Sequence, residues 1–262
     1  MTQTAHLREA QERILSYRGG RMGISAVPGS GKTFTLSHLA AQLVLSTPLE
    51  EDQEVLIVTF SNSAVNNFVS RIDRLMRGYG IIEGIGYRVR TLHGLANDII
   101  HERPELAGLP IDFQIIDESE GERLLDEAVD SALRANPSWV EGILDPDQSQ
   151  RDPNIRRKEL PETVKRMAAA FIASCKNYGL LPQDLLPHLA DTRSDLLEIN
   201  TKIYQGYQDA LAYRGAVDFN DLIRLAKQCL DTDPSLVQLL KHRWPFVLED
   251  EAQDSSIMQQ EI

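Results

Sequence analysis

Cysteine, aromatic residues and long apolar runs are all scarce in this sequence. Only two of its 262 residues are cysteines, and 6% are aromatic. Cys175 and Cys229 show no Cys-x-x-Cys spacing and have no pair of histidines beside them, which indicates buried thiols rather than a disulfide framework or a metal site. The longest apolar runs, such as residues 55–58, have the length of a strand and fall far short of the ~20 residues of a membrane-spanning helix.

A secretory signal is also missing. Residues 1–6 lack a basic start and an apolar centre, and an acidic residue follows at Glu9. The composition, 42% apolar and 25% charged, lies in the ordinary range of folded proteins that bury a core. We therefore expect a folded, cytoplasmic protein.

The net charge is strongly negative, −12 at pH 7. This balance argues at first against a nucleic-acid partner, because proteins bind the phosphate backbone through Lys and Arg. The acidic residues are concentrated after residue 100, with a cluster at 112–130, whereas residues 151–176 are rich in Lys and Arg. A basic face can therefore coexist with the acidic total, although both clusters are also compatible with solvated helix surfaces.

Strand and helix patterns alternate over the first 100 residues. Strands are predicted at Arg21–Val27, Glu54–Phe60 and Tyr87–Thr91, and each precedes a helix, at Thr33–Leu45, after Ser61 as N-cap, and at His93–Ile100. This alternation is typical of a parallel sheet covered on both faces.

From about residue 101 the pattern becomes mostly helical. Helices are predicted at Ser119–Ala135, Glu162–Lys176, Ser194–Tyr213, Asp218–Leu230 and Ser235–His242. Phe246–Leu248 is then a short apolar strand that leads into acidic residues. We interpret the middle region as a helical insertion, after which the sheet resumes.

Residues 26–33, Ala-Val-Pro-Gly-Ser-Gly-Lys-Thr, match a phosphate-binding loop between a predicted strand and a predicted helix. Glycines let backbone N–H groups turn toward phosphate oxygens, and the following helix directs its positive end at the same anion. Lys32 would reach the outer phosphates, and the Thr33 hydroxyl would bind Mg²⁺. An ordinary glycine-rich turn is the alternative. The predicted ATP site comprises Ala26, Pro28, Gly29, Ser30, Gly31, Lys32, Thr33 and Phe34.

Asp250 and Glu251 follow the last predicted strand. A phosphate-binding loop needs an acidic partner at a neighbouring strand end, because the metal and the attacking water must both lie beside the γ-phosphate. One carboxylate can hold Mg²⁺ while the other orients or deprotonates the water. Such a pair alone is common on surfaces, and its combination with the loop favours the functional interpretation.

Residues 250–254, Asp-Glu-Ala-Gln-Asp, resemble the Asp-Glu-x-Gln-Asp box of the UvrD/Rep-type superfamily 1 helicases. In the order of that family, Leu7 and Gln11 resemble its glutamine motif, residues 59–62 and 91–94 resemble two single-strand-contacting motifs, and Val217–Phe219 stands in the place of a further short motif. Each small motif is weak alone, but the ordered set is specific and covers essentially the whole chain.

The resemblance implies a role for each matching residue of the ATP site. Lys32 and Thr33 would bind phosphate and Mg²⁺, Asp250 would hold the metal, Glu251 would act as general base, Gln253 would sense the γ-phosphate and Gln11 would contact adenine.

It also implies a track for single-stranded DNA, lined by Thr59, Phe60, Ser61 and Asn62, with Thr91 and His93 as further contacts. An aromatic face stacks on any base, so such a track is indifferent to sequence. Phe60 is also compatible with a buried aromatic at a strand end, and His93 with a packing residue.

Three positions depart from the family pattern. Phe34 stands where Arg is usual, Ser63 where Lys is usual, and Glu249 where an apolar residue is usual. These changes put in doubt one polar contact near the nucleotide and one phosphate contact. A third carboxylate beside Asp250 also requires a partner or solvent.

The resemblance implies a RecA-like P-loop NTPase core with a parallel sheet, built from residues 1–100 and 216–262 and interrupted by an all-helical subdomain at 101–215. We expect the N-terminal part of an ATP-dependent DNA helicase that acts on single-stranded or partially duplex DNA. A second RecA-like motor domain would complete the ATP site and is absent from these residues. The chain alone should therefore hydrolyse ATP poorly and not unwind DNA.

Two other functions share the phosphate-binding loop. One is a nucleotide-gated binding or regulatory module without motor activity. The other is a small-molecule kinase, which the long separation between the loop and Asp250 disfavours.

Overall fold

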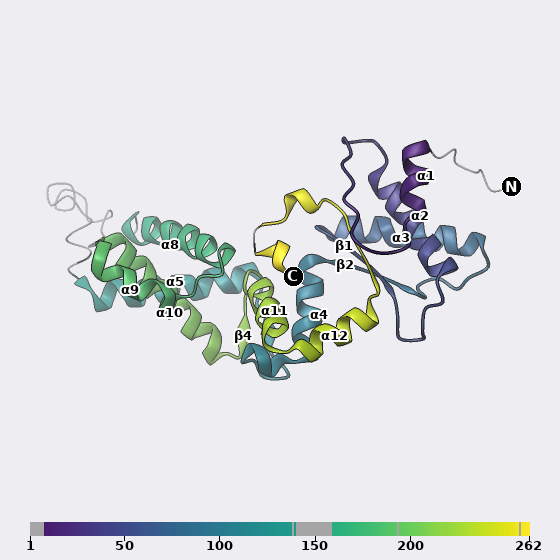
Figure 1. The fold of residues 1–262 in the computed structure, drawn as a ribbon. Coiled ribbons are helices and arrows are strands. Elements are labelled where there is room, and N and C mark those ends of the chain that lie inside the picture. Colours follow the sequence, from purple (N-terminus) through teal and green to yellow (C-terminus); the bar gives the residue numbers. More distant parts are fainter. Residues whose placement is uncertain (1–7, 138, 140–158, 193, 257) are drawn as a thin grey trace. The chain divides into compact units, whose positions relative to one another are not determined.

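A computed structural model of the protein describes residues 8–137, 139, 159–192, 194–256 and 258–262 (Figure 1). The chain divides into two compact units. Unit 1 comprises Met1–Glu102 and Leu230–Ser255, and unit 2 comprises Arg103–Cys229 and Ser256–Ile262.

Unit 1 contains a three-stranded parallel sheet and the helices around it. Its elements are α1 (Glu9–Leu15), α2 (Lys32–Ser46), β1 (Val55–Thr59), α3 (Asn62–Gly78), β2 (Tyr87–Thr91), α4 (Leu92–Glu102), α12 (Pro234–Arg243), β5 (Phe246–Glu249) and the 3-10 turn η3 (Ala252–Asp254). The predicted strand at residues 87–91 is confirmed, and the predicted cap of α3 is confirmed because the Ser61 side chain accepts a hydrogen bond from the Ala64 N–H.

The sheet has the strand order β2-β1-β5, with every pairing parallel. β1 is buried along its whole length, and it is paired so that Thr59 lies opposite Thr91 of β2, while Val58 lies opposite Glu249 of β5. All three strands therefore end at the same edge.

Helices α2 and α3 pack on one face of this sheet. Leu39 and Leu43 of α2 and Phe68 of α3 share a buried core with Val55 and Ile57 of β1. Since side chains alternate along a strand, Leu56 and Val58 point to the opposite face, where α4 contacts β1 and β2. The short first helix α1, which the pattern did not predict, lies against α2.

The strand predicted at Arg21–Val27 does not form. These residues make no ladder with another strand, and most of them are exposed, including Met22 and Ile24. Three glycines at 19, 20 and 23 raise the entropic cost of ordering the segment, which opposes strand formation without a paired neighbour.

Unit 2 is predominantly helical. Its elements are the 3-10 turn η1 (Pro104–Ala107), β3 (Gln114–Ile115), α5 (Glu118–Ala135), α8 (Leu160–Asn177), α9 (Pro182–Thr192), α10 (Asp195–Tyr213), β4 (Ala216–Val217), most of α11 (Asp221–Thr232) and the 3-10 turn η4 (Gln259–Glu261). The expectation of an all-helical insertion is wrong in one respect, because β3 and β4 pair as a short parallel sheet. Two-residue strands carry too little periodicity to be predicted.

The second boundary between the units lies at Cys229, whereas the sequence pattern placed it at residue 215. Buried polar contacts bind α11 to the helical unit. Lys176 of α8, with a side chain only 1% exposed, donates to Asp218 at 2.6 Å and to Asp221 at 2.7 Å. Asp218 also accepts from the Tyr207 hydroxyl at 2.8 Å, so this cluster joins α8, α10 and α11.

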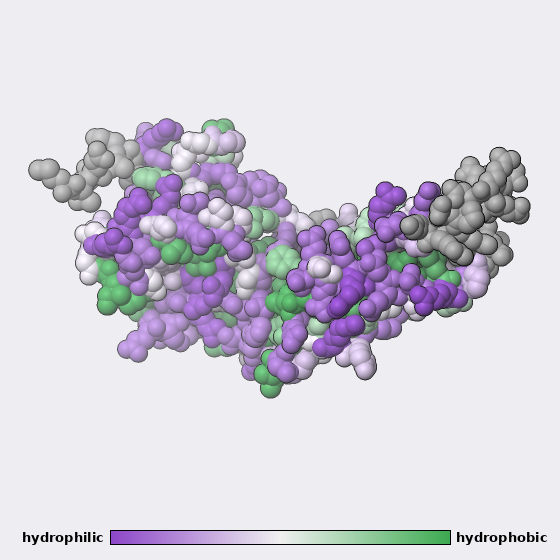
Figure 2. All heavy atoms as spheres, turned by 180° about the vertical axis from the view of Figure 1, so that it is seen from behind, coloured by the Kyte–Doolittle hydropathy of each residue, from purple (hydrophilic) through white to green (hydrophobic). Residues whose placement is uncertain are grey.

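Within the described residues, no helix is both long enough and apolar enough to cross a bilayer. Hydrophilic side chains cover much of the face in Figure 2, and hydrophobic residues there form small separate groups.

Candidate nucleotide-binding and nucleic-acid-binding sites

The predicted phosphate-binding loop leads directly into α2 in unit 1. Gly29 and Gly31 have φ angles of 76° and 92°, which residues with a Cβ rarely adopt, so glycine is needed at both positions. Gly31 caps α2 without a side-chain hydrogen bond, which leaves first-turn N–H groups available to an anion. The Ser30 hydroxyl is buried and has no hydrogen-bond partner. A phosphate in this cradle would fit all three features.

The acidic box and the loop meet at this point, although more than 200 residues separate them in sequence. Lys32 Nζ lies 2.7 Å from Glu251 Oε2, and the Thr33 hydroxyl lies 3.5 Å from Asp250 Oδ2. Gln253 also donates to Glu251 through its side-chain amide. β5 positions this box, since the Asp250 N–H donates to the Val58 carbonyl at the end of β1.

The two adjacent carboxyl groups have opposite pKa shifts. Asp250 is buried, and burial together with the neighbouring Glu251 charge raises its pKa. The hydrogen bonds from Lys32 and Gln253 lower the pKa of Glu251, and the same contact with Glu251 raises the pKa of Lys32. Glu251 also has a φ of 61°, the only positive φ of a non-glycine residue in the described chain. Its backbone conformation is thus strained by about 1–2 kcal/mol.

A cavity of about 780 Å³ extends from this cluster. It is lined by Gln11 and Tyr17 from the N-terminal segment, by Ala26, Ser30 and Lys32, and by residues 247–253. Gln11 donates to the Thr35 hydroxyl at 3.1 Å, a contact that sequence reasoning missed because Thr35 lies beyond the loop motif.

Phe34 does not line this cavity. Its ring instead lies 4.2 Å from the His38 ring, measured between centroids. Glu249, the third carboxylate of the box, accepts a hydrogen bond from the Ser255 hydroxyl at 3.2 Å, which supplies the partner that its position requires.

The residues predicted to contact DNA lie at or just after the ends of β1 and β2, at the same sheet edge as Asp250. They differ in exposure. Phe60 is 37% exposed, whereas Thr59 is 2% exposed, and Thr91 uses its hydroxyl to cap α4 through the Gly94 N–H. Ser61 caps α3, and Asn62 is the first residue of that helix and exposed. Burial lowers the pKa of His93.

A family model described as the UvrD/REP helicase N-terminal domain matches residues 7–262. The chain belongs to this family. The DNA helicase II proteins of Salmonella typhimurium and Escherichia coli are each 30% identical to it over 253 residues, which is 97% of this chain and 31% of the relative. The ATP-dependent DNA helicase PcrA of Staphylococcus aureus is 23% identical over 251 residues, 96% of this chain and 30% of the relative. This UvrD/REP domain thus spans about a third of the length of the curated relatives that it matches.

Proposed function

We propose that this UvrD/REP domain is the ATP-binding N-terminal part of a DNA helicase that couples ATP hydrolysis to movement along single-stranded DNA. The observation that carries the proposal is the convergence of Lys32 on Glu251 and of Thr33 on Asp250. The helicase names of the relatives support the same activity, and none of them supports a regulatory module without motor work.

Residue roles follow from the chemistry of the donors. Mg²⁺ and the triphosphate, when bound, would supply the electrophilic phosphorus and neutralise its charge. The Thr33 hydroxyl and the Asp250 carboxylate are oxygen ligands of the type that Mg²⁺ prefers. Lys32 would leave Glu251 for the phosphates, and Glu251, with its lowered pKa, would remain ionised and able to accept a proton from water.

The two units have different parts in this proposal. Unit 1 would be the RecA-like core and unit 2 the inserted subdomain. ATP would lie between unit 1 and a second motor domain supplied by the rest of a longer protein. Single-stranded DNA would cross the carboxyl edge of the sheet at Phe60 and Asn62. The basic cluster at 151–176 is a further predicted contact, and its residues 151–158 lie outside the described residues.

The test is nucleotide binding by this chain. Wild type should bind ATP in the presence of Mg²⁺, and Lys32→Ala should abolish that binding, because the loop loses its only lysine. Isothermal calorimetry measures both, with Lys241→Ala as the control, since this exposed lysine lies on α12 away from the cavity lining. Unchanged affinity in Lys32→Ala would contradict the proposal.

A further inference from the structure

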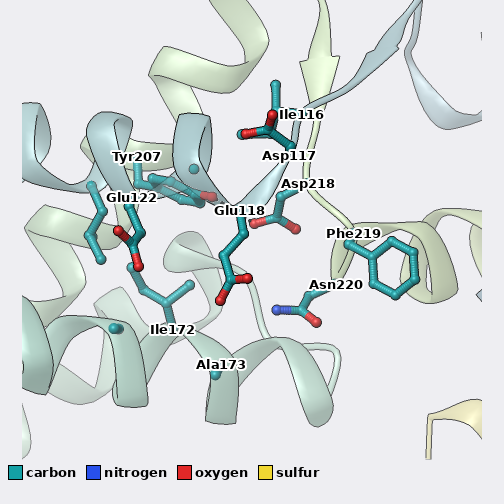
Figure 3. A pocket seen from close by; sticks show the side chains of 13 residues that line it. Ile116, Asp117, Glu118, Glu122, Ile172, Ala173, Tyr207, Asp218, Phe219 and Asn220 are labelled. Carbon is teal, nitrogen blue, oxygen red and sulfur yellow. Dashed lines mark hydrogen bonds between the residues drawn. The ribbon is translucent and has the colours of Figure 1, made fainter.

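A second cavity, of about 580 Å³, lies wholly within unit 2 and has no part in the ATP site (Figure 3). Three helices, α5, α8 and α10, surround it together with two connecting segments, the one between β3 and α5 and the one that follows β4. Its lining includes Asp218 and Phe219, which belong to a short motif that the proposed mechanism does not use.

The floor of this cavity is apolar. Ile116, Leu125 and Ile172 are each at least nine-tenths buried and present their remaining surface to it. Small residues on α8, Ala169 and Ala173, keep the space open. Such a floor gains free energy when the apolar stem of a side chain covers it.

The walls are acidic. Four carboxylates, those of Asp117, Glu118, Glu122 and Asp218, line the cavity, and no lysine or arginine does. Two of them are already engaged: Asp117 caps α5 by accepting from the Glu120 N–H, and Asp218 is paired with Lys176.

Glu118 and Glu122 are the pair that remains. Within the described residues, neither side chain makes a hydrogen bond or an ion pair. Lys165 attracts Glu122 from a distance, which contributes to the raised pKa of Lys165, but its ion pair is with Asp126, at 2.9 Å. They lie four residues apart on α5, so their like charges repel. Figure 3 shows both pointing toward the helix that carries Ile172 and Ala173. The dipole of α5 favours Glu118 in the first turn but does little for Glu122.

We propose that this cavity is a docking site for a basic peptide segment of a partner protein. An arginine or lysine would lay its aliphatic stem on the floor and place its cation between Glu118 and Glu122. Charge complementarity selects this occupant, because DNA is an anion and a second copy of this chain carries −12.

The test uses the whole chain and a fluorescein-labelled peptide of alternating arginine and leucine, followed by fluorescence anisotropy. The double variant Glu118→Gln with Glu122→Gln should bind about tenfold more weakly, since each lost contact is a charge-assisted one. Glu162→Gln is the matched control, an exposed first-turn glutamate of α8 outside the cavity, and should bind within about twofold of wild type.

A filling variant separates docking from general attraction to an acidic protein. Ala173→Phe leaves every charge in place but occupies the floor, so it should also weaken peptide binding about tenfold, with unchanged circular dichroism. Binding equal to wild type in both the double and the filling variant would overturn the proposal. Equal losses of peptide affinity in the double variant and in Glu162→Gln would overturn it as well. This test is independent of the ATP-binding measurement proposed above, because the cavity lies outside the ATP site.

Discussion

Asp250 is the residue at which function and stability oppose each other. Its carboxyl is buried beside Glu251, and both facts raise its pKa in the folded chain. The folded state therefore holds this proton more tightly than the unfolded state, and the residue lowers stability as the pH rises through its pKa. A charge kept at such a cost fits a metal ligand.

Replacing this carboxyl should therefore stabilise the fold. At pH 7 we expect Asp250→Asn to raise the Tm of unit 1 by about 2 °C while Mg²⁺-dependent ATP binding is lost. The difference in Tm between wild type and Asp250→Asn should narrow at acid pH, because a protonated Asp250 is uncharged, as asparagine is. Scanning calorimetry at both pH values measures this effect. Asp254→Asn, an exposed acid of the same box, should leave Tm unchanged, and a lower Tm for Asp250→Asn would refute the argument.

Glu251 should restrain Lys32 when no nucleotide is bound. Glu251→Gln removes the ion pair and one negative charge beside the phosphates, so we expect ATP affinity about threefold tighter. Equilibrium calorimetry at low ionic strength provides the comparison. Weaker binding would mean that the carboxylate contributes to nucleotide binding directly rather than competing for Lys32.

At the scale of single elements, the loop before β2 constrains the packing of unit 1. Gly86 has a φ of +80°, and a Cβ there would lie 2.7 Å from Val44 Cγ1 of α2. Gly84, two residues earlier, has a φ of +77° and nothing within 4 Å. Both glycines have a positive φ, but only Gly86 would bring a Cβ against Val44, so comparing substitutions at the two positions distinguishes backbone strain from steric overlap.

Gly86→Ala should destabilise unit 1 by about 3 kcal/mol, and Gly84→Ala by about 1 kcal/mol, because only the former adds overlap to strain. Urea titration in a Trp139→Phe background would follow unit 1 alone, since Trp244 lies in that unit and is buried. An equal loss of unfolding free energy in the two variants would show that Val44 and α2 shift to accommodate the added methyl group.

Elements with strong local signals were predictable from the sequence, and those that depend on distant partners were not. The apolar run of β1, the strand at residues 87–91 and the Ser61 cap each follow from a few adjacent residues. Arg21–Val27 has the pattern of a strand but lacks a paired edge. For the candidate site, motif order predicted that Lys32 and Glu251 would meet, but not the positive φ of Glu251, which depends on its surroundings.

At the scale of the molecule, an acidic chain is proposed to bind a polyanion, so a small number of contacts must suffice. We expect weak binding of a single-stranded oligonucleotide that falls steeply with salt. Phe60→Ala should weaken it about tenfold without changing the salt slope, because stacking is lost and no charge is removed. Fluorescence anisotropy measures both quantities, with the 70% exposed Tyr79→Ala as control. A changed slope would contradict a stacking role.

The common register of the three strands has a mechanical consequence. Asp250 and Phe60 each follow a strand of one hydrogen-bonded ladder, Thr91 ends the third strand, and β1 lies in the centre. Because hydrogen bonds along such a ladder resist sliding of one strand past another, the proposed metal ligand Asp250 and the exposed Phe60 ring should move together as one rigid unit. Movement along bound single-stranded DNA would then require another domain to move relative to this sheet, because the sheet itself would not bend.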